Sequence, residues 1–474
     1  MKRNAVVVGF DFPFIRDVIY KLEESNVIEI NKWFISSGTD DEGIKLKNAV
    51  HWRYLIEGDI QFNYEYNISD DIYLKLKNNF YTYLDQLVRE SYFENRAVYE
   101  NLNVINIFIH YFYDLLIKNK IEIIIFSDAP HGAYACILYD IAKLLNIKTL
   151  ICFPCYMRDK FLICWDLDDI GYYKLNSKYN FKQEKDDNII DGNFEKKVFW
   201  EPQKAFRLDN WLKDKKNSFK AYSYKYDNLF DWLSRHIIKS TSRKYQKYLY
   251  NLNYNKIFKD KIQKGENFVY FPIHLQPEMT TSTLGGIYND QILVIEKIRK
   301  IIPDNWYIYV KENPLQTYQW RDKYFFLRLK GFKNIRFISK ITNTYELINQ
   351  SQFVATITGT AGFEAISGGK PVLTFGRAWY RSLPGVTVYN DMVQLNDIMK
   401  TFTIEDVRKA FDELSANFIE GVIAEEVYKY QEVDVEENKK KIYSCLKIII
   451  TSENMNTWNK KDIKINADNS YSIS

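Results

Sequence analysis

The chain has 474 residues, 46% of them hydrophobic, and a formal net charge of +4. This length exceeds what one hydrophobic core usually serves, so we expect two domains. The small net charge argues against a dedicated nucleic-acid binder, which would carry a strongly basic domain.

Neither the cysteines nor the N-terminus indicates secretion. The five cysteines show no paired metal-ligand pattern, and three of them lie in apolar runs typical of buried thiols. The apolar run Ala5–Phe10 is too short for a signal peptide, and Asp11 interrupts it. No segment approaches the roughly 18 apolar residues of a membrane span. We therefore expect a reduced, cytoplasmic protein.

The first part of the chain predicts a Rossmann-like domain over residues 1–195. The predicted elements are a strand at Ala5–Phe10, a helix at Pro13–Glu24, a strand at Val27–Ser36, helices over Asp70–Lys118, a strand at Ile121–Phe126, a helix at Ala133–Leu145 and a strand at Ile147–Phe153. Continuous apolar strands that alternate with helices are typical of a parallel sheet covered on both faces.

A basic stretch follows, and we predict a helical linker over residues 196–262. Residues 196–261 hold 17 Lys and Arg against 6 Asp and Glu. One interpretation is a surface that contacts the anionic inner membrane or an anionic glycan. The other is a solvated helical segment between two domains.

A second Rossmann-like domain is predicted over residues 263–400. Its predicted strands are Asn267–Ile273, Trp306–Val310, Ile335–Phe337, Phe353–Ile357 and Pro371–Phe375, and its predicted helices are Asp290–Ile302, Thr344–Gln350 and a segment ending at Ser367. Two such domains with a helical linker predict a GT-B-like α/β fold with an active site in the cleft between the lobes. Residues 401–450 predict helices that pack back on the first domain, and 451–474 a loose tail.

The strongest motif is the turn between a strand and a helix at Thr356–Ala365. Its candidate donor-binding residues are Thr358, Gly359, Thr360, Ala361, Gly362 and Glu364. Glycines let the backbone approach a ligand, and a helix N-terminus favours a phosphate. The alternative is a well-capped helix whose glycines serve packing alone. The chain lacks GxxxxGK[ST], and its first strand ends in a single glycine, so ATPase and dinucleotide dehydrogenase functions are disfavoured.

Two further predicted strands end in polar residues. The first runs into His274, Gln276 and Glu278, and the second into Lys311 and Glu312. Ligands of open α/β sheets bind outside the carboxyl ends of the strands. We therefore expect His274 to donate to a pyrophosphate or a sugar carboxylate, Lys311 to neutralise a leaving phosphate, and Glu312 to hold a ribose or orient the lysine.

Together these motifs resemble a known family. The series His274-Leu-Gln-Pro-Glu278, Val310-Lys-Glu-Asn-Pro314, Thr358–Ala365 and Gly369-Lys-Pro371, over about Tyr270–Gly385, is similar to the capsule polysaccharide biosynthesis family. That family includes bacterial β-Kdo transferases, GT-B enzymes that use CMP-Kdo. The resemblance implies a metal-independent glycosyltransferase with no cofactor, although Asn313 stands where the family turn has His.

The first domain is expected to supply the acceptor site and a catalytic base. Asp128 and His131 follow the strand Ile121–Phe126, and Asp11 follows the first strand. Each can remove a proton from an acceptor hydroxyl if it lies within hydrogen-bond reach. The alternative for Asp128 is that it only caps the following helix.

One motif points to different chemistry. Asp166-Leu-Asp168-Asp169 contains carboxylates spaced by one residue, which in GT-A transferases hold a divalent cation. The flanking residues are more typical of a hairpin or loop, so we predict no metal site.

The sequence thus favours a glycosyltransferase that moves a sugar from a nucleotide-activated donor, with CMP-Kdo as the first guess, to a surface polysaccharide or glycolipid. One alternative is a sugar-nucleotide epimerase or a phosphoryl-type transferase on the same fold. Another is a non-catalytic binding protein of capsule assembly.

Overall fold

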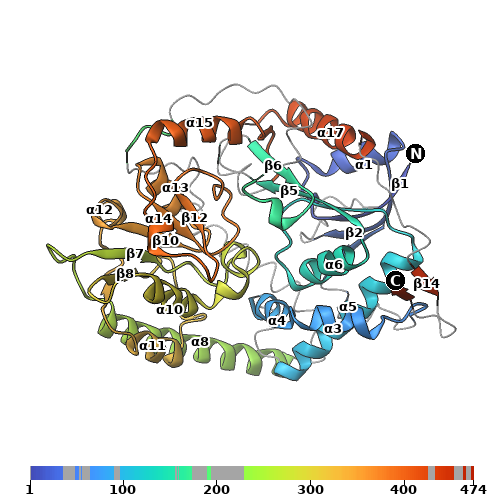
Figure 1. Cartoon of the computed structure of the whole chain (residues 1–474). Helices are drawn as coiled ribbons and strands as arrows, with labels where there is room; N and C mark the ends of the chain where they lie inside the picture. Colours follow the sequence, from blue (N-terminus) through green and yellow to red (C-terminus); the bar gives the residue numbers. More distant parts are fainter. Residues whose placement is uncertain are drawn as a thin grey trace. The chain divides into compact units, whose positions relative to one another are not determined.

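The computed structural model describes residues 2–35, 48–52, 55, 64–89, 97–154, 157, 160–172, 189–193, 229–424, 433–452, 463–465 and 471–473. The chain divides into two compact units. The first unit comprises Met1–Asp187, Ser282–Gly286 and Phe411–Ser474, and the second unit comprises Asn188–Thr281 and Ile287–Ala410. Each contains a largely parallel sheet with helices (Figure 1), which confirms the predicted α/β class with two Rossmann-like domains. The predicted cleft and the predicted domain boundaries stay predictions.

The first unit contains a seven-stranded sheet in the order β13-β6-β5-β4-β1-β2-β3. Its strands are β1 Arg3–Val8, β2 Ile28–Ile35, β3 Ala49–His51, β4 Ile123–Phe126, β5 Lys148–Pro154, β6 Lys160–Cys164 and β13 Ile419–Glu420. The strands from β3 to β5 are parallel, whereas β6 and β13 add an antiparallel edge. All four side chains of β4 are buried, as expected for a central strand with helices on both faces.

Helices from both ends of the chain complete the first unit. They are α1 Arg16–Glu24, α3 Asp70–Lys77, α4 Phe80–Arg89, α5 Val98–Lys118, α6 Ala133–Leu144 and α17 Val435–Ser452. The C-terminal helix α17 packs against α1, and Lys439 Nζ lies 2.6 Å from Asp17 Oδ2.

The second unit contains a six-stranded, fully parallel sheet in the order β12-β11-β10-β7-β8-β9. Its strands are β7 Phe268–Pro272, β8 Tyr307–Lys311, β9 Ile335–Ile338, β10 Phe353–Thr356, β11 Val372–Thr374 and β12 Val386–Val388. The helices are α8 Leu229–Ile257, α9 Met279–Ser282, α10 Gln291–Ile301, α11 Lys323–Lys330, α12 Thr344–Gln350, α13 Thr360–Ser367, α14 Leu395–Ile398 and α15 Ile404–Ser415. Of these, α9 and α15 cross the boundary between the units.

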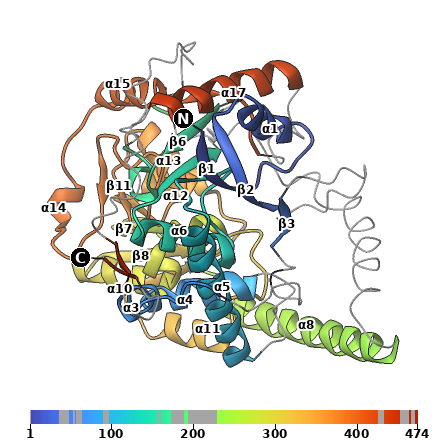
Figure 2. The ribbon, with the colours of Figure 1, turned by 90° about the vertical axis from the view of Figure 1, so that its right-hand side faces the viewer.

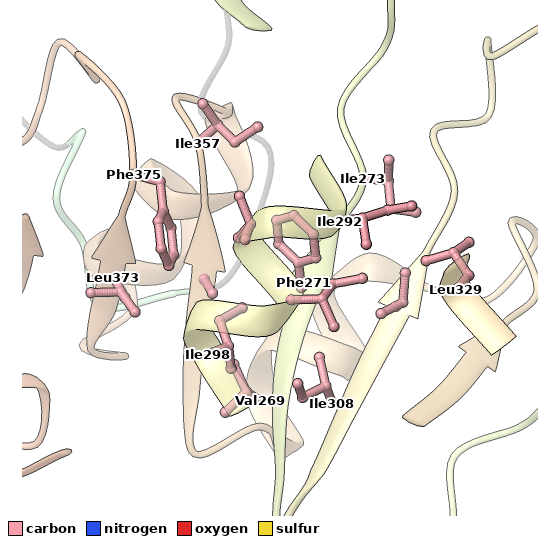
Figure 3. Close-up of a cluster of buried hydrophobic side chains, with 14 of the residues drawn as sticks. Val269, Phe271, Ile273, Ile292, Ile298, Ile308, Leu329, Ile357, Leu373 and Phe375 are labelled. Carbon is pink, nitrogen blue, oxygen red and sulfur yellow. The ribbon is translucent and has the colours of Figure 1, made fainter. Parts of the chain in front are cut away.

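Alternating side chains of β7 face two helical layers. Val269, Phe271 and Ile273 join a buried apolar cluster with Ile292 and Ile298 of α10 (Figure 3). The opposite face of the sheet packs against α12 and α13. This face carries the polar side chains that form the candidate site.

Several elements were not predicted from the sequence. They are the strands β3 and β12, of three residues each, and the helix α11, of eight residues. The expectation of a loose tail after residue 450 is wrong in part, because α17 continues to Ser452 and β14 Ile463–Ile465 pairs with β15 Tyr471–Ile473. Both strands alternate large apolar and polar residues, which suits a hairpin. None of the described helices has the length and hydropathy needed to cross a membrane.

Candidate functional site

The candidate site lies in the second unit, at the carboxyl ends of β7 and β10. These neighbouring strands are separated in sequence by β8 and β9, so the strand order reverses between them. The connections that leave the two strands diverge, and such a reversal opens the crevice where α/β sheets bind ligands. The residues after β7 lead to His274, and those after β10 lead to Gly359.

His274 is a buried, neutral imidazole that joins these two strand ends. Its Nε2 lies 2.8 Å from Thr356 Oγ1 and accepts a hydrogen bond from the Ile357 amide at 3.2 Å. Because Nε2 is an acceptor, the ring proton lies on Nδ1. No hydrogen bond joins Nδ1 to another described residue. Burial and then the charge of Arg321 lower the pKa of His274 to about 4, which keeps the ring uncharged near neutral pH.

The two glycines at the start of α13 serve packing within the protein. A Cβ on Gly359 would lie 2.9 Å from His274 Cε1, and one on Gly362 would lie 2.1 Å from Tyr380 Oη. The Tyr380 hydroxyl donates to the Gly359 carbonyl at 2.5 Å. The glycines therefore make room for His274 and Tyr380, as the packing alternative expects. Close approach of a ligand to this backbone stays a prediction.

Lys311 lies at the end of β8 with its ammonium group held by neutral acceptors. Its Nζ donates to the Thr342 carbonyl and to Thr344 Oγ1, both at 2.7 Å. Burial lowers the pKa of Lys311, while the nearby Glu364 carboxylate acts to raise it. Glu364 is itself buried in α13. Burial raises the pKa of Tyr270 in β7, and the Glu364 charge raises it further. The predicted residues Lys311 and Glu364 thus belong to one buried cluster.

Glu312, the residue after Lys311, is paired with an arginine that the sequence analysis missed. The side chains of Glu312 and Arg321 are both fully buried, and Arg321 Nε lies 2.8 Å from Glu312 Oε2. A second bond joins Arg321 Nη2 to Glu312 Oε1 at 3.3 Å. The two bonds form the bidentate arrangement in which Arg–carboxylate pairs are strongest. A buried Glu requires such a cation, but nothing in the sequence marks Glu312 as buried, so the pairing appears only in the structure.

Arg321 also fixes the loop that carries His274. Its Nη1 donates to Gln276 Oε1 at 2.8 Å, and its Nη2 donates to the His274 carbonyl at 3.0 Å. Gln291 and Gln316 complete this network with hydrogen bonds to the Gln276 side chain and backbone. The residue before Arg321, Trp320, has a φ of 55°, an unfavourable left-handed conformation for a bulky side chain.

Gln276 and Glu312 therefore support the loop from within the protein. The remaining predicted donor residues lie nearer the surface: Thr360 and Ala361 are half-buried in the first turn of α13, and Glu278 is half-buried before α9. The Thr358 hydroxyl donates to the Thr280 carbonyl at 2.7 Å and so connects the start of α13 to α9. Contact of any of these residues with a donor stays a prediction.

The first unit has the same strand-order reversal, between β1 and β4. A Cβ on Gly9, after β1, would lie 1.9 Å from Ser127 Oγ, after β4, so the two strand ends touch. Asp11 is fully buried beyond this contact. Burial makes Asp11 less accessible to an acceptor than Asp128 or His131, which are half-buried.

Asp128 and His131 make different contacts with Ala129. Asp128 Oδ1 accepts from the Ala129 amide at 2.6 Å. The expectation that Asp128 caps the following helix is wrong, because α6 begins at Ala133 with Gly132 as its N-cap and no side-chain cap. His131 Nδ1 lies 2.8 Å from the Ala129 carbonyl, which can only accept. The proton of a neutral His131 therefore lies on Nδ1, and Nε2 keeps the lone pair of a base.

The DxD motif lies in a structural turn. Asp166 caps the short helix Leu167–Asp169, accepts from Tyr139 Oη at 2.9 Å and pairs with Lys143 at 2.6 Å. Within the described ranges, no three His, Cys, Asp or Glu side chains are arranged to hold a metal ion.

Comparisons with known proteins give one family and distant structural likenesses. Residues 197–410 match the family described as capsule polysaccharide biosynthesis protein. A comparison with curated protein sequences gives no match.

Three of the similar solved structures are two sugar transferases and one epimerase. The KpsC β-Kdo 2,7 transferase of Thermosulfurimonas dismutans is 12% identical, over 70% of this chain and 88% of its own, with a TM-score of 0.31. The β-Kdo 2,4 transferase of the same protein is 11% identical, over 63% and 79%, with a TM-score of 0.29. A UDP-GlcNAc 2-epimerase from Methanocaldococcus jannaschii is 12% identical, over 95% and 100%, with a TM-score of 0.23. TM-scores this low support no assignment of activity.

We expect Arg321→Met to lower the free energy of unfolding by about 3 to 5 kcal/mol, because it leaves the Glu312 carboxylate buried without its cation. Adding Glu312→Gln to this variant should restore part of the loss. Chemical denaturation with a spectroscopic signal from the second unit measures both changes.

Arg328→Met is the matched control, since Arg328 pairs with Asp290 at 2.7 Å but is about half exposed. Its cost should stay below about 1 kcal/mol. Equal losses for Arg321→Met and Arg328→Met would contradict the role given to the buried pair.

The buried neutral state of His274 predicts a pH dependence of stability. Its pKa is lowered to about 4 in the folded protein, so between its ordinary pKa and this value only the unfolded chain binds the proton. Stability is therefore lost as the pH falls through this window. Relative to His274→Gln, the wild type should lose about 2 kcal/mol between pH 7 and about pH 4.5. Parallel stability curves for the two proteins would contradict the prediction.

Proposed function

We propose that the chain is a glycosyltransferase with a nucleotide-activated sugar as donor, on the premise that residues 197–410 match the capsule polysaccharide biosynthesis protein family. The observation that carries the proposal is the neutral His274, held against the first turn of α13 with its ring proton on Nδ1. A hydrogen-bond donor beside a helix N-terminus, at the reversal of a parallel sheet, suits a phosphate group.

The proposed reaction joins the acceptor hydroxyl oxygen to the anomeric carbon of the donor. The bond from that carbon to the nucleotide phosphate breaks, and the phosphate leaves with the electron pair. Hydrogen-bond donors that are already in place when this negative charge develops are usually the largest contribution to catalysis. Here these donors are the Nδ1–H of His274, the amides at the start of α13 and, one strand away, the ammonium of Lys311.

The donor class and the acceptor follow from the family. We propose a CMP-activated, Kdo-like sugar as the first donor to test and a surface polysaccharide or glycolipid as the acceptor. We further propose that no metal ion takes part, since Lys311 and His274 supply hydrogen-bond donors to the leaving phosphate. In the first unit, we propose that Nε2 of His131 takes the proton of the acceptor hydroxyl.

A thermal-shift series with CMP, UDP, GDP and dTDP tests the donor site, because a ligand that binds only the folded state raises the melting temperature. The wild type should respond most to CMP, and Lys311→Met should weaken this binding about tenfold or more. Lys370→Met is the matched control, since Lys370 Nζ also donates to two carbonyls. Lys370 precedes β11 and so lies at the amino ends of the strands, whereas the candidate site lies at their carboxyl ends. A chain that responds to no nucleotide, or equal losses in both variants, would refute the site.

Sugar transfer with purified donor and acceptor tests the base. His131→Asn retains a donor for the Ala129 carbonyl but lacks Nε2, so turnover should fall about 100-fold or more with the fold intact. Asp128→Asn retains the acceptor for the Ala129 amide and should stay within about threefold of the wild type if Asp128 only holds this turn. The reverse order of effects would assign the base to Asp128. An epimerised donor in the absence of acceptor would instead indicate an epimerase.

A further inference from the structure

An apolar stripe runs along the solvent-facing side of α8. Tyr245, Tyr248, Leu249 and Leu252 are 61%, 59%, 37% and 50% exposed. Their spacing of three, one and three residues places all four on one face of the helix. Single exposed apolar residues are common, but a row of four on one helix face marks an interaction surface.

The other side of α8 is anchored in the second unit, so the stripe is not needed for its core. Tyr250, Tyr254 and Ile257 are buried in the apolar cluster of the sheet. Tyr250 contacts Phe326 of α11 at 6.1 Å between ring centroids, and Tyr254 Oη accepts from the Lys340 amide at 2.9 Å. These contacts fix the rotation of α8 about its axis and leave the stripe outward.

The charge around the stripe has one sign. From Thr241 to Ile257, α8 carries Arg243, Lys244, Lys247 and Lys256 and no Asp or Glu. Lys244 lies one turn before Tyr248, and Lys256 lies one turn after Leu252, so both flank the stripe.

The neighbouring helix α11 has the same character. It packs beside α8 (Figure 2) and exposes Tyr324 and Leu327, each by 60%. Its eight residues include Lys323 and Lys330 and no acidic residue. The acidic groups close to the two helices are engaged. Asp322 caps α11, Asp290 pairs with Arg328, and Asp260, three residues after α8, accepts from the Phe337 amide.

We propose that the exposed face of α8, extended by α11, is a docking surface for an anionic lipid membrane. Tyrosine and leucine side chains enter the interface between headgroups and acyl chains, while lysines pair with lipid phosphates. An acidic protein partner would explain the lysines but not the apolar stripe between them. The proposal does not rest on the proposed transfer reaction.

Flotation of the full chain with vesicles tests the proposal without donor or acceptor. The wild type should bind phosphatidylglycerol vesicles, bind phosphatidylcholine vesicles far more weakly, and dissociate as salt rises. Leu249→Glu combined with Leu252→Glu should lower the partition coefficient more than about tenfold, because it removes apolar contacts and adds repulsion. Circular dichroism and thermal melting show whether this variant keeps its fold.

Met392→Glu is the matched control, because Met392 is 82% exposed in the same unit but lies outside α8 and α11. It should keep the partition coefficient within about twofold of the wild type. No binding of the wild type to anionic vesicles, or equal binding of the double variant, would overturn the proposal. A dimer in sedimentation velocity that the double variant dissociates, with no vesicle binding, would identify a second copy as the occupant and also overturn it.

Discussion

The reversal of strand order in each parallel sheet is the constraint on which the candidate site depends. Strands β7, β8 and β9 extend the sheet in one direction, and β10 then returns to the free side of β7. The connections after β7 and β10 must therefore leave the sheet edge in opposite directions. The gap between them is where His274 meets Thr356 and the start of α13. The first unit repeats this geometry at β1 and β4, where Gly9 meets Ser127.

The polar residues of the second unit form two groups with different physical roles. The side chains of Arg321, Glu312 and Gln276 are buried and form hydrogen bonds with one another. They are therefore not exposed to a ligand at the surface. This inner group holds the backbone of His274 in place. His274 and the half-buried residues at the start of α13 are the outer group, which includes the Nδ1–H donor of His274. A rigid inner group that positions an outer one is what binding of a charged ligand requires.

The sequence predicts the central strands well, because a continuous run of apolar residues indicates a strand that is buried on both faces. The apolar run of β4 and the turn at Thr356–Ala365 fall where they were expected. The pairing of Arg321 with Glu312 could not be predicted, since it depends on how the loop between the two residues folds. The motif at Gly359 and Gly362 was located correctly, but only the structure shows that His274 and Tyr380 occupy the space that these glycines leave. Short edge strands such as β3 carry too few residues for a pattern.

The division of the chain between its units has a consequence for biosynthesis. The first unit takes β13 and α17 from residues after Phe411, while the second unit is complete at Ala410. As the ribosome extends the chain, the second unit thus acquires all of its strands before the first unit acquires its last edge strand and the helix that covers α1. Domains usually fold in order from the N-terminus. Here the second unit can complete its sheet first, and β6 of the first unit lacks its outer partner strand until residues 419–420 have been synthesised.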